Sequence, residues 1–297
     1  MGSEESSQLV WLITGTSSSF GRELVDIALA RGDQVIATAR SVKRLGDLPK
    51  TPSVRLMELD VTAGSDVIKR KINEAVTWFG RIDVLVNNAG IAARAIAEEG
   101  GSQIFMENAK INVLGALDVT NAVLPQMRAR KSGTIVMIGS RSSWKSEVET
   151  LAYYSSTKAA LRVFGETLAY ELDQFSIRVL IVEPAAFRTW SPNFLTPSIT
   201  PVKISDYNPL RDGSEKKVAV IHGRQPGDPR KAMELVVDVV RGEGKAKALL
   251  EKYGWPLYLP IGKEAEDAIR EKTQQIGHVL DVWGDLIRDT RLDEEAT

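Results

Sequence analysis

The sequence of 297 residues contains no cysteine, and this absence excludes whole classes of chemistry. Disulfide bonds, thiolate catalysis and cysteine-ligated metals all need a thiol. Histidine is nearly absent as well, because only His222 and His278 occur, so we expect no metal site. No apolar run approaches the roughly 18 residues of a membrane-spanning helix, and the polar start of the chain lacks the pattern of a signal peptide. The sequence therefore predicts a cytoplasmic protein without a membrane partner.

An excess of charge of either sign is missing too, since 38 Lys and Arg residues face 39 Asp and Glu residues. The formal net charge of −1 gives no electrostatic footprint for nucleic acid. One basic run, Arg128–Lys131, falls at the expected end of a helix, where positive charge complements the helix dipole. We therefore expect the partner to be a small molecule and not nucleic acid.

Short β-branched runs alternate with longer helical patterns along the first two thirds of the chain. This alternation predicts an α/β fold, a doubly wound parallel sheet of Rossmann type with helices on both faces. No internal repeat is present, so residues 8–297 are expected to form a single domain. The expected strands are 9–14, 34–39, 54–59, 82–87, 133–139 and 177–183, and the expected helices are 20–31, 65–79, 103–130 and 151–175.

The pattern changes after Thr189. Pro192, Pro197, Pro201 and Pro209 interrupt residues 190–226 and leave little periodicity, and a loop of this length is typical of a lid over a binding site. Residues 228–297 form a C-terminal extension. Its expected elements are a helix from Pro229, capped by Asp228, to about Arg241, a strand over 257–261, and two closing helices over 264–275 and 279–288.

The first expected strand runs into residues 14–21, Thr-Gly-Thr-Ser-Ser-Ser-Phe-Gly, directly before a helix. Glycines at such a turn let the backbone approach a pyrophosphate at the helix N-terminus. A serine-rich helix cap would look similar, but the position within a β-α-β unit favours nucleotide binding. At the end of the second strand, NAD-selective sites carry an acid, and this chain has Arg40 instead. A guanidinium there can grip a 2′-phosphate, which favours NADP(H) over the alternative of a plain surface arginine.

Two further motifs follow in order: Asn87-Asn88-Ala89-Gly90 after the fourth strand, and Tyr154-x-x-x-Lys158 on a later helix. With them, residues 8–190 resemble the short-chain dehydrogenase/reductase family. A weaker likeness extends to about residue 270 through Gly-Asp-Pro at 227–229 and Leu-Pro-Ile-Gly at 259–262.

The chemistry explains the residue types of the last motif. Tyr154 and Lys158 share one face of a helix, and a nearby ammonium lowers the pKa of a phenol from its ordinary value near 10. Tyr154 can then give its proton to a carbonyl oxygen as a hydride arrives, or take it back in the oxidation direction. Tyr153 is the competing candidate, but it lies about 140° around the helix from Lys158. We therefore choose Tyr154.

The family resemblance implies further catalytic roles. Ser140 would hydrogen-bond the reacting oxygen, although Ser142 or Ser143 could replace it. Asn112 would keep a water in the proton relay, although taken singly it could be an ordinary helix residue. Lys158 would also hold the nicotinamide ribose.

The resemblance also places residues on the cofactor. Asp60 would contact the adenine amino group, with a helix N-cap as the alternative role. Ser19 and Ala185 stand where the family has glycine, and each adds a Cβ at a place of close approach or permissive torsion. The full expected cofactor set is Gly15, Ser17, Phe20, Gly21, Arg40, Asp60, Val61, Asn88, Gly90, Lys158, Phe187 and Thr189.

Together these features predict an NADP(H)-dependent oxidoreductase that interconverts a ketone or aldehyde and an alcohol, and that forms a homodimer or homotetramer. One rival is a catalytically idle NADP(H)-sensing protein of the same fold, and another is an epimerase or dehydratase. A bulky, largely apolar substrate is expected because the lid and the last strand are rich in apolar side chains. These are Trp190, Phe194, Leu195, Ile199, Ile204, Tyr207, Trp255 and Tyr258.

Overall fold

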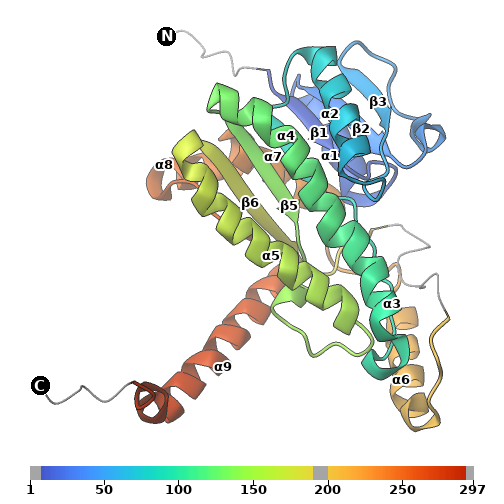
Figure 1. Cartoon of the computed structure of the whole chain (residues 1–297), viewed down its shortest axis with the longest axis vertical. Helices are drawn as coiled ribbons and strands as arrows, with labels where there is room; N and C mark the ends of the chain where they lie inside the picture. Colours follow the sequence, from blue (N-terminus) through green and yellow to red (C-terminus); the bar gives the residue numbers. More distant parts are fainter. Residues whose placement is uncertain (1–7, 190–199, 292–297) are drawn as a thin grey trace, which may run out of the picture.

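The computed structural model describes residues 8–189 and 200–291 of the chain. In these residues seven parallel strands form one sheet in the order β3-β2-β1-β4-β5-β6-β7 (Figure 1). This confirms the predicted doubly wound α/β fold, with the order reversing between β1 and β4. The strands are β1 (Val10–Ile13), β2 (Gln34–Ala39), β3 (Val54–Glu58), β4 (Val84–Asn87), β5 (Gly133–Ile138), β6 (Ile177–Pro184) and β7 (Tyr258–Ile261).

Both faces of the sheet are covered, because side chains alternate along each strand. Trp11 and Ile13 of β1 pack in one core with α1 (Ser19–Ala30) and α7 (Pro229–Arg241). The intervening residues Val10 and Leu12 pack in a second core. The helices that cover this second face are α2 (Ser65–Phe79), α4 (Ala116–Arg130) and α5 (Ala152–Leu172).

The helix expected over residues 103–130 is three consecutive segments. These are α3 (Ala97–Ala109), the π-helical segment η2 (Lys110–Gly115) and α4. The start of α3 was missed because Gly100 and Gly101 interrupt the helical pattern, and Gly101 has a positive φ of 58° that kinks the helix. Wider turns of the π type are common at functional sites, and η2 carries Asn112.

The expectation of little regular structure over residues 190–226 is wrong in part, and the role of this segment as a lid stays a prediction. Residues 190–199 lie outside the described chain, and with them Trp190, Phe194, Leu195 and Ile199. The remainder contains η5 (Ser205–Tyr207) and the helix α6 (Asn208–Ile221) where no regular structure was expected. Pro209 was interpreted as a helix breaker, but it lies in the first turn of α6, where a missing N–H costs nothing. This helix lies beside α3 (Figure 1). An ion pair between Arg211 and the buried Glu99 holds the two helices together.

The C-terminal extension begins with α7 as predicted, capped by the Asp228 side chain, and continues through α8 (Lys247–Tyr253) into β7. The two expected closing helices are one helix, α9 (Lys263–Arg288), because Gly277 is tolerated in its interior. In Figure 1 α9 runs away from the body of the protein. Its outer half exposes the large apolar side chains Ile276, Val279, Leu280, Val282, Trp283, Leu286 and Ile287. No helix in the described part of the chain is long and apolar enough to cross a membrane.

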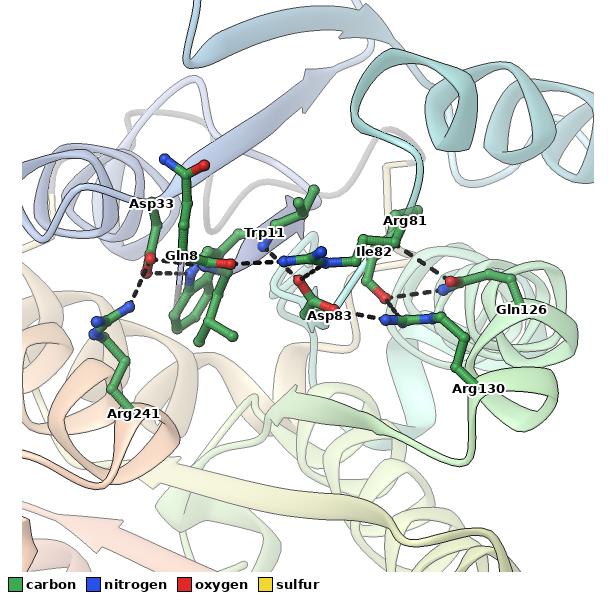
Figure 2. A network of polar contacts seen from close by, with 11 residues as sticks. Gln8, Trp11, Asp33, Arg81, Ile82, Asp83, Gln126, Arg130 and Arg241 are labelled. Carbon is green, nitrogen blue, oxygen red and sulfur yellow. Dashed lines mark hydrogen bonds and ion pairs between the residues drawn. The ribbon is translucent and has the colours of Figure 1, made fainter. Parts of the chain in front are cut away.

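Two carboxylates hold β1 at the amino edge of the sheet (Figure 2). Asp33 accepts hydrogen bonds from Trp11 Nε1 at 2.8 Å and Arg241 Nη1 at 2.5 Å. Asp83 accepts from Arg81 Nε and from Arg130 Nη1, both at 2.8 Å. These carboxylates also accept backbone N–H groups of the strand and of the residue before it. These contacts therefore stabilise the sheet at the amino ends of its strands. In folds of this kind ligands bind at the opposite, carboxyl ends.

Candidate active site and cofactor cleft

The turn between β1 and α1 lies at the carboxyl edge of the sheet. Gly15 has a positive φ of 72°, which glycine adopts without strain. A Cβ at Gly21 would lie 2.4 Å from the Gly15 carbonyl oxygen, so this approach of helix to turn requires glycine. Ser17 and Phe20 lie between the two glycines and are half-buried. The turn and the start of α1 are therefore closely packed, and a pyrophosphate at this helix N-terminus stays a prediction.

The two departures from family glycines behave differently. Ser19 has a φ of 54°, in the left-handed region that costs a residue with a Cβ roughly 1–2 kcal/mol. Ala185 is not among the described residues with positive φ, and its N–H donates to the Ile261 carbonyl oxygen at 2.9 Å. Torsional strain is therefore present at the first position and not at the second.

Thr14 ties the turn to the end of β4. Its hydroxyl oxygen accepts the backbone N–H groups of Asn88 at 2.9 Å and Ala89 at 3.0 Å. In return, Asn88 Nδ2 donates to the carbonyl oxygens of Thr14 at 2.8 Å and Gly15 at 3.0 Å. Asn88 therefore shapes the cleft by joining its two sides, in addition to any contact with a ribose.

Arg40 and Asp60 follow the carboxyl ends of β2 and β3. Arg40 is exposed at the end of β2 and forms no ion pair within residues 8–189 and 200–291. Oδ1 of Asp60 accepts from Thr62 N at 2.9 Å and Thr62 Oγ1 at 2.8 Å. The residue that caps α2 is Gly64, so the alternative role of Asp60 as a helix N-cap is wrong. Val61 is buried next to it.

The helix α5 and the end of β5 bring Tyr154, Lys158 and Ser140 together. Nζ of Lys158 lies 5.8 Å from the centroid of the Tyr154 ring and donates to the Ile138 carbonyl oxygen at 2.6 Å. Ser140 is hydrogen-bonded to Tyr154. Its hydroxyl oxygen accepts from Ser142 N at 3.2 Å and from Ser142 Oγ at 3.0 Å. Of the three candidate serines, Ser140 is thus the one beside the tyrosine, with Ser142 orienting it.

Burial dominates the electrostatics of this pair. It lowers the pKa of Lys158 to about 8, because an ammonium loses its hydration there. Burial also raises the pKa of Tyr154, while the hydrogen bond with Ser140 acts in the opposite direction. The expectation that Lys158 brings the pKa of Tyr154 below its ordinary value is therefore not met in this structure. The reason is that desolvation of the phenolate outweighs the nearby polar groups.

Tyr153, the competing candidate, points away from the site. Its ring is buried and packs against Gly100, where a Cβ would lie only 2.5 Å from the ring. Its hydroxyl donates to the Ala97 carbonyl oxygen of α3. The 140° separation around the helix thus places Tyr153 on the α3 side and Tyr154 on the Lys158 side.

Asn112 is buried in the π-helical segment, and its side chain is fully engaged within the chain. Nδ2 donates to the Ile91 carbonyl oxygen and to Thr157 Oγ1, both at 2.9 Å, and Oδ1 accepts from Ile91 N at 2.8 Å. A Cβ on Gly90 would lie 3.2 Å from Asn112 Oδ1 and 3.5 Å from Lys158 Nζ. Asn112 and Gly90 therefore lie beside Lys158. Because the Asn112 side chain is engaged within the chain, only its backbone groups could take part in a proton relay.

Phe187 and Thr189 follow the carboxyl end of β6. The Phe187 ring is buried and packs edge-to-face on Phe20, with centroids 5.5 Å apart. Thr189 N donates to the Phe187 carbonyl oxygen at 2.8 Å. The Phe187 ring is therefore part of the core, and its expected contact with a nicotinamide stays a prediction.

Three residues near the site were missed by sequence reasoning: Thr14, Thr157 and Glu183. The first two act through partners more than 40 residues away in the sequence, which no local pattern reveals. Glu183 could have been found from the sequence, because it is the one acidic residue in the otherwise apolar end of β6.

Comparisons with known proteins agree with this geometry. A family profile described as short chain dehydrogenase matches residues 9–196. "Oxidoreductase BOA17" of Botryotinia fuckeliana is 30% identical over 281 residues, which cover 93% of this chain and 97% of that protein. "3-Ketodihydrosphingosine reductase" of Bacteroides thetaiotaomicron is 31% identical over 178 residues, 60% of this chain and 64% of that protein.

Among solved structures, a short-chain dehydrogenase from Streptomyces avermitilis superposes with a TM-score of 0.80 at 33% identity. The match covers 96% of this chain and 100% of that one. Taken with the sheet order and the family profile over most of the chain, these likenesses show that the chain belongs to the short-chain dehydrogenase/reductase family of oxidoreductases, whose typical cofactor is a nicotinamide dinucleotide.

Proposed function

We propose that this oxidoreductase is an NADP(H)-dependent carbonyl reductase and alcohol dehydrogenase that acts on a bulky, largely apolar substrate. Tyr154 is its general acid and base, assisted by Lys158, Ser140 and Asn112. The observation that carries the proposal is the contact of Tyr154 with Ser140, on the helix face that also presents the buried Lys158.

The cleft fits the cofactor. Gly15 and Gly21 carry no Cβ at the turn where a pyrophosphate would lie, and Gly90 lies beside Lys158, where a ribose would lie. Arg40 is exposed, without an ion-pair partner in the described residues, at the position that selects between the two dinucleotides. These features support NADP(H), with Arg40 holding the 2′-phosphate.

When bound, the reduced nicotinamide supplies a hydride to the carbonyl carbon. The residues of this chain manage the proton. Ser142 fills the acceptor side of the Ser140 hydroxyl, so the Ser140 proton can be donated to the Tyr154 oxygen or to the substrate oxygen. Tyr154 donates its own proton to the carbonyl oxygen. The Lys158 ammonium donates one hydrogen bond to the Ile138 carbonyl oxygen. Its positive charge can stabilise the tyrosinate that forms when Tyr154 gives up its proton.

An apolar substrate is supported by the likeness to "3-ketodihydrosphingosine reductase". Of the expected apolar wall, Trp255 and Tyr207 make contacts within the protein. Trp255 packs against the core under α7, with Nε1 donating to the Val179 carbonyl oxygen at 2.7 Å. Tyr207 is held on α3 by its hydroxyl, which donates to Glu98 at 2.7 Å. We therefore leave Trp255 and Tyr207 out of the proposed substrate wall.

The test is NADPH consumption with a panel of ketones and aldehydes that range from small and polar to long-chain and apolar, with NADH run in parallel. We expect turnover that favours NADPH and the apolar members. Tyr154→Phe removes one hydroxyl and should lower kcat by about 10²–10⁴-fold, while Tyr153→Phe, the matched control, should be mild. NADPH binding without turnover of any carbonyl would support the idle sensor instead.

A further inference from the structure

Glu183 is a fully buried carboxylate at the carboxyl end of β6, next to the strand that ends in the Ser140 turn. Burial raises the pKa of its carboxyl group, and hydrogen bonds from Ser143 and Trp144 oppose that rise. A buried charged or polar group costs free energy unless it is well paired, so a carboxyl here needs a reason. It has no part in the proton path of the proposed function.

The two partners of Glu183 belong to the Ser140 turn, residues 140–144. Ser143 Oγ donates to Oε1 at 2.5 Å, and the indole Nε1 of Trp144 donates to Oε2. Ser140 starts this turn as the N-cap of η3 (Arg141–Ser143), and its hydroxyl is oriented by Ser142. One carboxylate therefore holds the far end of the turn whose near end faces Tyr154.

The indole of Trp144 is itself fixed from two other sides. The guanidinium of Arg162 lies 4.3 Å from its ring centroid, and Tyr258 of β7 packs edge-on with centroids 6.2 Å apart. These contacts aim the indole N–H at Glu183 and join the turn to α5 and β7. The Ser140 turn is thus held by β6, α5 and β7. Of these contacts, those with Glu183 of β6 are the hydrogen bonds.

We propose that Glu183 is a positioning residue for the reductase reaction: by holding Ser143 and Trp144 it sets where the Ser140 hydroxyl lies beside Tyr154. The inference rests on the proposed function. A misplacement of about 1 Å at a catalytic group can cost on the order of 100-fold in rate, so the effect belongs in kcat.

The chain offers a matched control for a purely structural role. Asp33 is a second buried carboxylate that accepts a tryptophan indole N–H, from Trp11, but at the opposite edge of the sheet. The variants Asp33→Leu and Trp11→Phe should lower the melting temperature and leave kcat of the folded enzyme unchanged. Comparison with Glu183→Leu and Trp144→Phe therefore separates positioning from stability.

We expect Glu183→Leu to lower kcat by about 10–100-fold with the KM for NADPH within about twofold of the parent. Trp144→Phe removes one of the two donors and should lower kcat by less. Glu183→Gln should restore most of kcat, because its amide oxygen can accept the indole N–H while its amide protons meet the Ser143 hydroxyl. If Glu183→Leu does not fold, Trp144→Phe and Ser143→Ala carry the same test.

Hydrogen exchange of residues 139–146 gives a second readout that does not depend on turnover. Faster exchange in this segment is expected in Glu183→Leu and Trp144→Phe but not in Asp33→Leu. Unchanged kcat together with unchanged exchange would overturn the positioning role. A parent enzyme that reduces no carbonyl would instead refute the proposed function, and the exchange result would then show whether Glu183 holds the turn.

Discussion

The buried ammonium of Lys158 makes the active site less stable than the same site with an apolar side chain. Its pKa is lowered from 10.5 to about 8 by burial. At about 1.4 kcal/mol for each tenfold change, this corresponds to roughly 3 kcal/mol of destabilisation at neutral pH, where folded and unfolded chains both hold the proton. Lys158→Met keeps the stem and removes the charge. Loss of the hydrogen bond to the Ile138 carbonyl oxygen lowers the free energy of unfolding by about 1 kcal/mol and so offsets part of this gain. The variant should therefore be about 1–3 kcal/mol more stable than the parent while losing activity.

The pH dependence supplies the sharper test. Between pH 8 and 10.5 the unfolded chain binds the Lys158 proton and the folded chain releases it, so stability rises with pH in the parent. Denaturant unfolding at pH 7, 8.5 and 10 should show the advantage of Lys158→Met shrinking as the pH rises. The exposed Lys69 on α2 is the control, and Lys69→Met should change neither the free energy of unfolding nor its dependence on pH. A variant less stable than the parent at pH 7, or an advantage independent of pH, would refute the argument.

Three further predictions follow from single contacts. Arg40→Ala should raise the KM for NADPH about 10–100-fold and leave that for NADH unchanged, as steady-state kinetics with both cofactors would show. Burial tends to raise the pKa of Asp83, but hydrogen bonds from Arg81 and Arg130 outweigh it and hold the pKa below its ordinary value. Asp83→Asn should therefore lose stability at pH 7, and the difference from the parent should shrink in thermal melts as the pH falls below about 4. Ser19→Gly should relieve the left-handed backbone and raise stability by up to about 1 kcal/mol in denaturant unfolding, with loss of stability as the contrary result.

Most of the sheet could be predicted because its strands are apolar runs buried on both faces, each followed by a helical pattern. The errors came where one residue type has two meanings. Pro209 starts α6 instead of preventing it, and Gly277 lies inside α9 instead of ending it. The position of a proline or glycine within a helix depends on neighbours that sequence spacing alone does not identify.

The site divides in the same way. The spacing of Tyr154 and Lys158 fixes a shared helix face, so their proximity followed from the sequence. The pKa of Tyr154 did not, because burial is a property of the whole fold. The contacts of Glu183 with residues 143 and 144 arise from the alignment of β5 beside β6, which places side chains 40 residues apart at one edge. Only the folded structure reveals such partners.

The hydrogen bonds of Thr14 have a thermodynamic consequence for ligand binding. They join the turn after β1 to the end of β4 within the protein itself, by contacts that need no ligand. The turn and the strand end are thus joined before any ligand binds, and under the proposed function a dinucleotide bound there would have little backbone to order. More of its interaction energy is then retained as affinity. Thr14→Val keeps the shape of the side chain but removes the acceptor of these hydrogen bonds. Each cofactor would then have to order the turn as it binds, and its affinity should fall by that entropic cost.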